Sequence, residues 1–403
     1  MHRCQICSSV QLSVVLDLGP QPLCNRFKTD PNEHEFYHPL ILGQCQNCGL
    51  IQLPNPVPPE EIIPRVEWLK YNEPEGHLDD LTEILCNLAG LPEKPVACGI
   101  TYKDDSLLKR LKGKKFDKTF RIDPKIDLGI TKQGIASETI IPMLTKETVK
   151  GLVEKYGQAD LIVARHILEH APDTQKFLES IKQLLKPGGY IVFEVPDCSL
   201  QLRTCDYTML WEEHMLYFVP DTLKNSFNYT PFKLFQYKKY RYSVENSLVA
   251  IVRQTNDDSD QIDSNISVSK QLSVGQNYAN NFSKNKTIVQ QYIKNYKEST
   301  GRISVFGAGH LSSMYINLME IKDYIDFIVD DDPNKQSIYM PGSSLPVKGS
   351  DSLINEGIKL CLLSLGPDSE EKVLKNNINF VENGGVFSSI FPQKDNSINL
   401  MKA

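Results

Sequence analysis

Two pairs of cysteines near the start of the chain restrict its fold more than any other feature. Cys4 and Cys7 form one C-x2-C pair, and Cys45 and Cys48 form a second. Each pair lets two thiolates from one tight turn bind the same ion, and two pairs complete a closed tetrahedral zinc site. A redox C-x-x-C pair is the alternative, but neither pair opens a helix after a strand, helix and strand pattern. We therefore predict one structural Zn²⁺, which organises a segment too small to hold a core alone.

The redox state of the cysteines depends on the compartment. The N-terminal residues MHRCQICSS lack the apolar stretch of a signal peptide, and no window approaches about 18 uninterrupted apolar residues. We therefore expect a cytoplasmic protein, in which ten cysteines do not form a disulfide framework. Six of them stand singly among mostly apolar residues and are expected in the core: Cys24, Cys86, Cys98, Cys198, Cys205 and Cys361.

The charge of the chain restricts its partners. The formal net charge is −6 and no polybasic run is present. A general nucleic-acid binder would carry a basic patch, and a protein that binds membrane surfaces would carry a basic cluster. We expect neither a nucleic acid nor a membrane as partner, and the sequence leaves the oligomeric state open.

The length of 403 residues predicts two or three domains. A proline-rich stretch at 55–64 marks the exit from the zinc module, and a polar stretch at 254–275 indicates a linker. Within the zinc module we expect a strand, a Gly-Pro turn and an extended segment over 12–27, and a hairpin over 37–54. The predicted domains are a zinc-binding module (1–65), a middle domain (66–253), a polar linker (254–275) and a C-terminal domain (276–403).

Strand and helix patterns alternate through the middle domain, which is typical of parallel sheets covered by helices. The clearest stretch is 159–197, where Phe177, Ile181, Leu184 and Leu185 share one helical face before Pro187-Gly188-Gly189 ends the helix. The C-terminal domain repeats the pattern, because an apolar strand at 302–306 leads into Gly307-Ala308-Gly309 and a helix. The fold class is therefore α/β, with a doubly wound sheet and a second, Rossmann-like sheet.

Several motifs together resemble a known family. The segment LEHAPDTQKFLESIKQLLKPGGYIVFEVPD (168–197) resembles the second half of class I S-adenosylmethionine-dependent methyltransferases. With CQIC, CQNC, LDLGPQPLCNRF, WEEHMLYF and the later GAG, nearly the whole chain resembles the three-part sugar C-methyltransferases. The resemblance implies S-adenosylmethionine as cofactor and a nucleotide-linked keto-deoxysugar as substrate, methylated on a ring carbon.

The resemblance also implies which residues bind the cofactor. They follow three strands at the ligand-binding edge of the sheet: Gly99, Thr101, Asp104, Asp105, Asp123, Arg165 and His166. Thr101 and Asp105 replace glycines of the family's turn, which we expect at a conformational cost, and Asp104 or Asp105 is expected to face the cofactor's ammonium. Asp123 matches the acid that binds ribose hydroxyls, although an Asp before Pro is also a common turn former.

The segment WEEHMLYF (211–218) matches the family's Tyr-His-Glu-His-Leu-Ser-Tyr-Phe, with Trp211 in place of the tyrosine. Methylation of a carbon next to a ketone needs a base, and His214 suits that role near neutral pH, with Glu213 to orient it or hold substrate hydroxyls. The alternative is a solvated Glu-Glu pair beside a structural histidine.

Weaker matches complete the predicted site. Tyr71 lies where the family carries an aromatic lid segment, and we expect loop hydrogen bonding for His170. Asn246 and Ser247 could contact the sugar, or form a β-bulge. Gly307 and Gly309 are expected to help enclose the sugar nucleotide, and the acids at 330–332 suit either a ribose or a turn. Methylation of oxygen or nitrogen, or a non-catalytic sugar-nucleotide-binding scaffold, are the alternative functions.

Overall fold

The computed structural model describes residues 3–66, 73–131, 134–243, 245–254 and 266–398. The chain folds into two compact units, and each gathers three separate segments. The first unit comprises Met1–Val14, Leu42–Ser199 and Glu213–Leu272, and the second comprises Val15–Ile41, Leu200–Glu212 and Ser273–Ala403. The division crosses the zinc-binding module and falls between Glu212 and Glu213, while the domain boundaries at 65, 253 and 275 stay a prediction.

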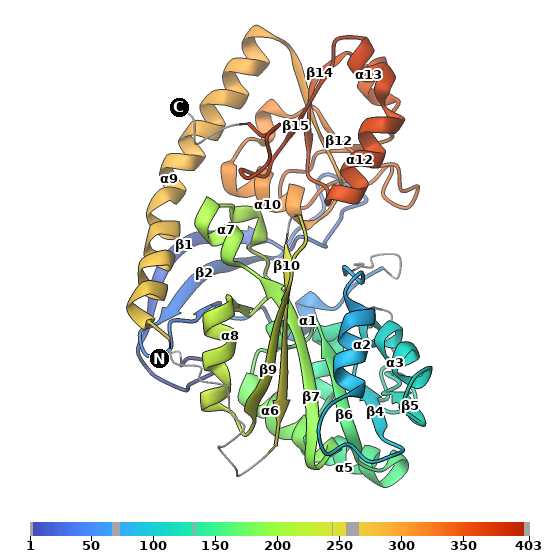
Figure 1. Ribbon diagram of the computed structural model, residues 1–403. Coiled ribbons are helices and arrows are strands. Elements are labelled where there is room, and N and C mark those ends of the chain that lie inside the picture. The colour runs from blue at the N-terminus through green and yellow to red at the C-terminus, as the bar shows by residue number, and fades with distance from the viewer. Residues whose placement is uncertain (1–2, 67–72, 132–133, 244, 255–265, 399–403) are drawn as a thin grey trace. The chain divides into compact units, whose positions relative to one another are not determined.

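The first unit contains a six-stranded sheet in the order β5-β4-β6-β7-β10-β9 (Figure 1). Its strands are β4 (Val96–Gly99), β5 (Lys118–Arg121), β6 (Ala159–Arg165), β7 (Leu185–Asp197), β9 (Lys233–Tyr240) and β10 (Asn246–Arg253). The first four strands in that order are parallel, and β10 runs antiparallel to both of its neighbours. The predicted α/β class is confirmed, and the carboxyl ends of β4, β6 and β7 lie at one edge.

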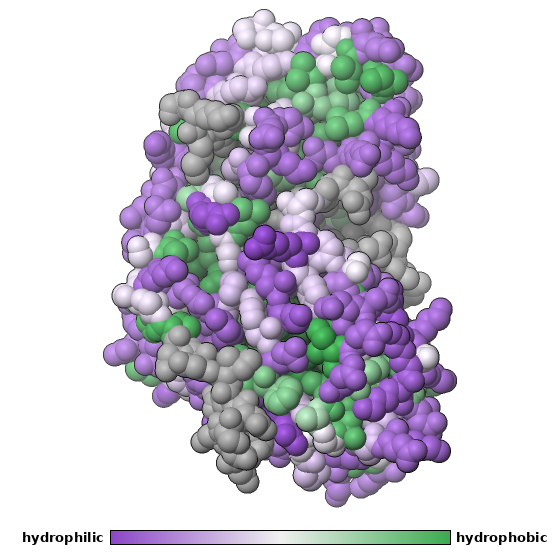
Figure 2. All heavy atoms as spheres, viewed as in Figure 1, coloured by the Kyte–Doolittle hydropathy of each residue, from purple (hydrophilic) through white to green (hydrophobic). Residues whose placement is uncertain are grey.

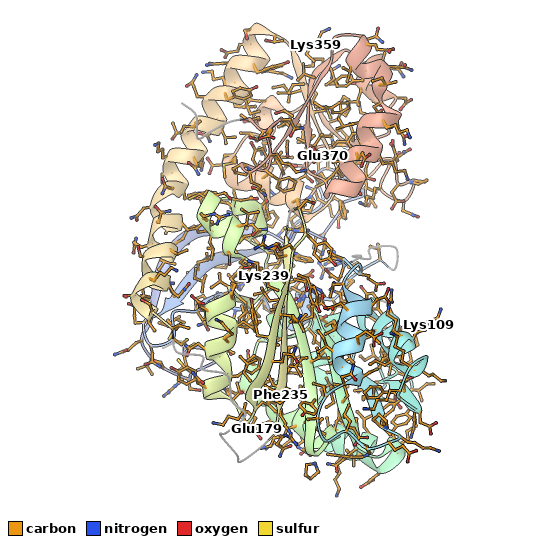
Figure 3. All side chains as sticks on the ribbon, in the orientation of Figure 1. Lys109, Glu179, Phe235, Lys239, Lys359 and Glu370 are labelled. Atoms are coloured by element: carbon orange, nitrogen blue, oxygen red, sulfur yellow. The ribbon has the colours of Figure 1, made fainter. Side chains whose placement is uncertain are left out.

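Helices cover the sheet of the first unit. Helices α2 and α3 bury leucines against β6, β7 and β10, whereas Lys109 on α3 is exposed and points outward (Figure 3). On β7, Phe193 stacks on Phe227, which follows α8. The helices of this unit are α1 (Pro59–Ile62), α2 (Leu78–Cys86), α3 (Asp105–Lys112), α4 (Ser137–Ile140), α5 (Lys146–Tyr156), α6 (Thr174–Ile181) and α8 (Pro220–Ser226). Helix α7 (Ser199–Thr204) begins at Ser199, which still belongs to the first unit, and its other residues belong to the second unit.

The 159–197 stretch folds as predicted, apart from one boundary. Phe177, Ile181, Leu184 and Leu185 are all buried, which confirms the predicted face. The helix ends earlier than expected, however, because β7 already begins at Leu185, which pairs with Ala159 of β6. The strand runs through the Pro-Gly-Gly segment, where Gly188 has a φ of 77° that other residues rarely adopt.

A small sheet in the order β1-β2-β3-β8 carries the cysteine pairs. Its strands are β1 (Leu12–Pro22), β2 (Tyr37–Cys45), β3 (Ile51–Gln52) and β8 (Leu216–Tyr217). The predicted hairpin over 37–54 is confirmed, since β2 and β3 pair antiparallel around the second cysteine pair. The predicted Gly-Pro turn is wrong, because β1 continues through Gly19, whose φ of 68° accommodates an irregularity without reversing the strand.

The second unit contains a parallel five-stranded sheet in the order β13-β12-β11-β14-β15. Its strands are β11 (Arg302–Phe306), β12 (Phe327–Val329), β13 (Val347–Lys348), β14 (Ile358–Leu363) and β15 (Val386–Ser389). Its further helices are α10 (His310–Met319), α11 (Ser352–Asn355), α12 (Pro367–Asn376) and α13 (Ile378–Glu382). Phe306, Phe327 and Phe380 form its core, and the Rossmann-like prediction is confirmed.

Helix α9 (Val268–Ser299) begins inside the stretch 254–275 that was predicted as a linker. The polar stretch was expected to reach residue 275, but the helix already begins at Val268. Gln271, Tyr278, Val289 and Ile293 recur at helical spacing on its buried face. The part of the helix before residue 276 is mostly polar or small (Ser269, Lys270, Gln271, Ser273 and Gly275), so the hydrophobic pattern there is too sparse to predict a helix.

Within the described ranges, no helix is both long enough and apolar enough to cross a membrane. Hydrophilic side chains cover most of the face in Figure 2, and the hydrophobic ones lie in separate patches.

Candidate functional site

The four predicted cysteine ligands converge. Their sulfur atoms all lie within 4.8 Å of one another, with 3.6 Å between Sγ of Cys4 and Cys48 and 3.5 Å between Sγ of Cys7 and Cys45. Tetrahedral Zn²⁺ with bonds of about 2.3 Å sets its sulfurs roughly 3.8 Å apart, so the cluster fits this ion.

The turn after β4 adopts its shape without the family's glycines. Thr101 has an extended backbone with a φ of −122°, and its hydroxyl accepts a hydrogen bond from the Lys103 N–H. From Gly99 to Asp105, no residue has a positive φ, so the expected conformational cost is absent. Gly99 is required for another reason: a Cβ there would lie 2.7 Å from Cδ1 of Leu108, which packs α3 against β4.

The buried carboxylate of Asp104 stabilises this turn through hydrogen bonds. Its carboxylate is completely buried and accepts hydrogen bonds from the N–H groups of Ile100, Thr101 and Arg165 at 2.7 to 2.9 Å. Burial raises the pKa of Asp104 to about 6 in spite of these donors. Asp104 is thus placed to shape the turn rather than to point out of it, and its predicted contact with the cofactor's ammonium stays a prediction.

The other two acids of the predicted cofactor site lie nearer the surface. Asp105 is ion-paired with Arg121 at 2.7 Å, and its side chain is 54% exposed. Asp123 follows β5, and its Oδ1 accepts hydrogen bonds from the N–H groups of Lys125 and Ile126. This arrangement is the turn that we gave as the alternative, and the ribose contact of Asp123 stays a prediction.

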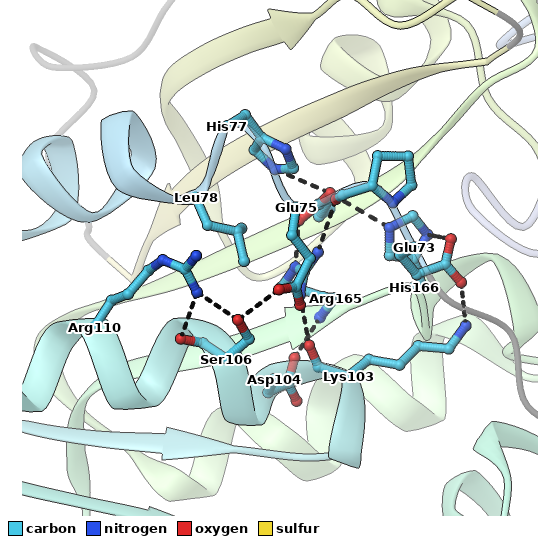
Figure 4. A network of polar contacts seen from close by, with 12 residues as sticks. Glu73, Glu75, His77, Leu78, Lys103, Asp104, Ser106, Arg110, Arg165 and His166 are labelled. Carbon is cyan, nitrogen blue, oxygen red and sulfur yellow. Dashed lines mark hydrogen bonds and ion pairs between the residues drawn. The ribbon is translucent and has the colours of Figure 1, made fainter. Parts of the chain in front are cut away.

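Arg165 and His166, at the carboxyl end of β6, belong to a buried polar network (Figure 4). Nε of Arg165 lies 2.5 Å from Glu194, and its Nη1 donates to the carbonyl of Lys103 at 2.6 Å. Burial alone would raise the pKa of Glu194, but hydrogen bonds from His166 and His77 hold it well below its usual value. Arg165 therefore ties β6 to β7 and to the turn after β4.

His166 is strained and charged. It has a φ of 47°, in the left-handed region that residues other than glycine seldom adopt. Burial opposes its protonation, but Glu73, Glu169 and Glu194 together raise the pKa of His166 to about 10. The imidazole is therefore a cation at neutral pH, at the edge of the sheet where ligands bind in open α/β folds.

The residues just before α2 close over this network. Glu73 is ion-paired with Lys103 at 2.7 Å, and Glu75 accepts a hydrogen bond from Ser106 (Figure 4). His77 contacts Glu194 at 3.1 Å and Tyr242. The predicted lid residue Tyr71 lies outside the described residues. Sequence reasoning missed Glu73, Lys103 and Glu194, although a charged residue within the otherwise apolar stretch 190–196 was a usable signal for Glu194.

His214 lies beside a second buried group. The rings of His170 and His214 pack edge to face, with centroids 4.7 Å apart, and Nδ1 of His170 lies 2.5 Å from Oε1 of Glu138. Glu212 and Glu213 are only 7% and 8% exposed, so the alternative of a solvated pair is wrong. His170, for which only loop hydrogen bonding was expected, instead links Glu138 to the candidate base.

These side chains include two sets that could hold a further divalent ion. Ligand atoms lie within 4.8 Å of one another in Glu169, His170 and His214, and also in Glu138, His170 and Glu213. The ion pair between Glu138 and His170 already gives the second set a role without an ion. Carboxylates and imidazoles are also the groups that orient substrates and transfer protons.

A cavity of about 340 Å³ opens beside these residues. Glu138 lines it, together with Gly129, Ile130 and Thr131, which follow β5, and with apolar residues in and after α1 and just after α4. The cavity is mostly apolar, as is usual for pockets that bind small molecules and cofactors. Since Glu138 also contacts His170, the cavity borders the group that contains His214.

The predicted sugar-contacting residues divide between the two units. In the first unit, Asn246 donates to Asp197 at 3.2 Å, and the buried Ser247 hydroxyl donates to Glu194 at 2.6 Å. The bulge alternative at these positions is wrong, because β10 pairs regularly with β7 there. The register shift lies farther along, between Ile251 and Val252 on the β9 side.

Gly307 and Gly309 of the second unit differ in the space that a side chain would have at each position. A Cβ on Gly307, whose φ is 106°, would lie 2.8 Å from both Ser364 and Leu365, whereas a Cβ on Gly309 would meet nothing within 4 Å. His310, the first residue of α10, stacks on Trp211 at 4.4 Å. Gly309 therefore opens to space beside an aromatic pair. Asp330 closes a turn, since it accepts hydrogen bonds from the N–H groups of Ala308 and Asp332.

Three comparisons with protein families match successive parts of the chain. Residues 4–62 match the family described as "Putative zinc binding domain", and residues 101–236 match "Methyltransferase domain". Residues 251–392 match "C-methyltransferase C-terminal domain".

Individual proteins match this chain at low sequence identity or over short segments. C-methyltransferase NovU of Streptomyces niveus is 22% identical over 222 residues, which cover 54% of this chain and 53% of that protein. A ubiquinone biosynthesis O-methyltransferase of Photorhabdus laumondii is 45% identical over 60 residues, 14% of this chain and 25% of that protein. A 1,6-didemethyltoxoflavin-N1-methyltransferase of Burkholderia thailandensis, solved with S-adenosylhomocysteine, aligns over 45% of this chain and 80% of its own, with 14% identity and a TM-score of 0.30. The chain thus spans about half the length of the first of these curated relatives.

Proposed function

We propose that this chain, whose successive parts match a zinc-binding domain, a methyltransferase domain and a C-methyltransferase C-terminal domain, transfers a methyl group from S-adenosylmethionine to a carbon atom. We further propose that the acceptor is a nucleotide-linked keto-deoxysugar, methylated next to its ketone. The observation that carries this proposal is the group of Glu138, His170 and the partly exposed His214, whose buried Glu138 lines a cavity at the ligand edge of a methyltransferase domain.

The charges at this edge suit the cofactor. Its described side chains include more carboxylates than cations: Glu73, Glu138, Glu169, Glu194 and Glu213 against Lys103, Arg165 and the protonated His166. A sulfonium is positively charged, so it is favoured where negative charge is in excess. The apolar cavity lined by Gly129 to Thr131 suits the adenine, and Asp123 at the end of β5 suits the ribose.

The chemistry assigned to the chain itself is removal of a proton. S-Adenosylmethionine supplies an electrophilic methyl group when bound. His214 removes the proton from the carbon next to the ketone, His170 and Glu138 hold the ring of His214 from one side, and Glu213 binds a substrate hydroxyl. The ion pair between Glu73 and Lys103 at this edge limits the access of water to the resulting enolate.

Product analysis tests this proposal. The protein is incubated with S-adenosylmethionine labelled in its methyl group and with a panel of nucleotide-linked keto-deoxysugars. Magnetic resonance of the product should show a methyl group bonded to carbon. A methyl group on oxygen would instead favour the O-methyltransferase alternative, for which the short similarity to a ubiquinone biosynthesis O-methyltransferase is the supporting observation.

A binding measurement tests the scaffold alternative. Titration calorimetry with S-adenosylhomocysteine should detect binding, and Asp123→Ala should weaken it by about 1.5 to 3 kcal/mol through the loss of charge-assisted hydrogen bonds. Asp117→Ala is the matched control, because Asp117 is exposed and directly precedes β5, at the opposite end of that strand from Asp123. No binding at millimolar ligand, with the sugar nucleotide present, would favour a non-catalytic scaffold.

A further inference from the structure

The short strand β3 contacts two sites at once. Gln52 is completely buried, and its Nε2 donates to Sγ of Cys4 at 3.2 Å. The Oε1 atom of the same side chain accepts a hydrogen bond from the N–H of Gln5 at 2.9 Å. One side chain thus binds a sulfur of the zinc cluster and the main chain inside the first cysteine pair.

The main chain of β3 faces the segment that contains His214. Ile51 pairs with Tyr217, and Gln52 pairs with Leu216 of β8. The Leu53 N–H then donates to the carbonyl of Met215 at 2.9 Å, and the Met215 N–H donates to the carbonyl of Glu169 at 2.7 Å. The residue that follows His214 is therefore held from both sides.

Neither of these strands is stable by itself. Strands β3 and β8 have only two residues each, and such short pairs are at best marginal without support. The other edge of β3 pairs with β2 around the Cys45 and Cys48 turn, which depends on the zinc cluster.

We infer that Gln52 is a positioning residue that couples the zinc centre to the His214 segment, so that the zinc module holds the candidate base in place. The amide of Gln52 stabilises the thiolate of Cys4, as groups outside the ligand shell commonly do for metal ligands. The backbone of Gln52 pairs with Leu216, two residues after His214, and so restrains the segment that contains His214. The role of His214 as base rests on the proposed function, whereas the coupling itself does not.

The substitution Gln52→Met tests the coupling, since it keeps a long buried side chain and removes both hydrogen bonds. Two readouts need no substrate. In protein loaded with Co²⁺ in place of Zn²⁺, loss of the hydrogen bond to Cys4 should shift the sulfur-to-cobalt charge-transfer absorption. Hydrogen exchange of the peptide that contains 213–219 should accelerate about ten-fold, which corresponds to about 1.4 kcal/mol and lies within the usual contribution of one hydrogen bond.

Gln44→Met is the matched control. Gln44 is also a buried glutamine of this small sheet, but its Nε2 donates to the carbonyls of Gly49 and Gln271 and not to a sulfur. This variant should leave the cobalt absorption and the 213–219 exchange unchanged.

The outcomes separate the coupling from general loosening. Faster exchange at 213–219 with an altered cobalt absorption, in Gln52→Met alone, supports the coupling. Wild-type exchange in a metal-loaded Gln52→Met protein overturns it, as does equal acceleration in Gln44→Met. If Gln52→Met does not fold, removal of zinc from the wild type by a chelator gives the same test. The exchange rate at 213–219 should then rise, and it should fall back to its original value when Zn²⁺ is restored. An exchange rate that does not depend on zinc overturns the coupling. A failure to bind S-adenosylhomocysteine would affect only the proposed function.

Discussion

The ring of His170 meets the ring of His214 edge to face, at 89° between planes and 4.7 Å between centroids. On its other side, Nδ1 of His170 lies 2.5 Å from the carboxylate of Glu138. A carboxylate, an imidazole and a second imidazole thus form a row that is buried at Glu138 and His170 and ends at the partly exposed candidate base. Such a row restricts both the orientation and the solvation of His214, which a base needs if it is to remove a carbon-bound proton.

His214→Asn should lower turnover by about 10² to 10⁴-fold, the usual contribution of a positioned base, with little change in the affinity for S-adenosylhomocysteine. His170→Asn should lower turnover less, because it displaces His214 without removing it. Rates with the acceptor found by product analysis, together with proton exchange of that acceptor in heavy water, measure both effects. His34→Asn, at an exposed position of the second unit, is the control. If His214→Asn keeps most of the methylation rate, His214 is structural.

The zinc cluster should hold one ion per chain. Cys45→Ser should reduce the bound zinc and lower the thermal stability of the small sheet, since the site contributes folding energy directly. Metal analysis and thermal unfolding measure the two effects. Cys361→Ser, at a buried position in β14, should leave the zinc content unchanged. A wild-type preparation without zinc would contradict the assignment.

The charge of His166 predicts how stability changes with pH. The pKa of His166 is raised in the folded protein to about 10, from 6.5 in the unfolded chain. The stabilisation is therefore complete below pH 6.5, and it is lost as the pH rises toward 10. In this window the free energy of unfolding should fall with a slope on the order of 1 kcal/mol per pH unit from this group.

Urea unfolding of the wild type and of His166→Asn, compared between pH 7 and 9, measures that slope. The variant should show a shallower decline than the wild type. Equal slopes would mean that His166 is neutral in the folded protein.

The two glycines after β11 should respond differently to alanine. Gly307→Ala should destabilise the second unit by about 2 kcal/mol, because φ is 106° there and the new Cβ would lie 2.8 Å from Ser364 and Leu365. The Cβ added by Gly309→Ala would meet no atom within 4 Å, so this substitution should destabilise the second unit by less than about 1 kcal/mol. It should also weaken the binding of the sugar nucleotide. Unfolding in urea and ligand titration separate the two. Equal stability of both variants would contradict the geometric argument.

Local spacing in the sequence determined the elements of this protein. The C-x2-C pairs, the alternation of strands and helices, and the apolar face of Phe177 and Ile181 act over a few residues. Each pattern therefore predicts the same local structure in any chain, and each of these predictions agrees with the structure. The same holds for Gly307-Ala308-Gly309 after an apolar strand, although only the structure separates the crowded Gly307 from the open Gly309.

Tertiary structure decided which side chains meet. Glu73, Lys103 and Glu194 come from a segment before α2, the turn after β4, and β7, and they join one network because parallel strands end at the same edge of the sheet. The left-handed backbone of His166 and the inward turn of Asp104 depend on partners distant in sequence. Charge and strain of this kind depend on burial and on long-range neighbours, and neither can be obtained from the spacing of residues along the chain.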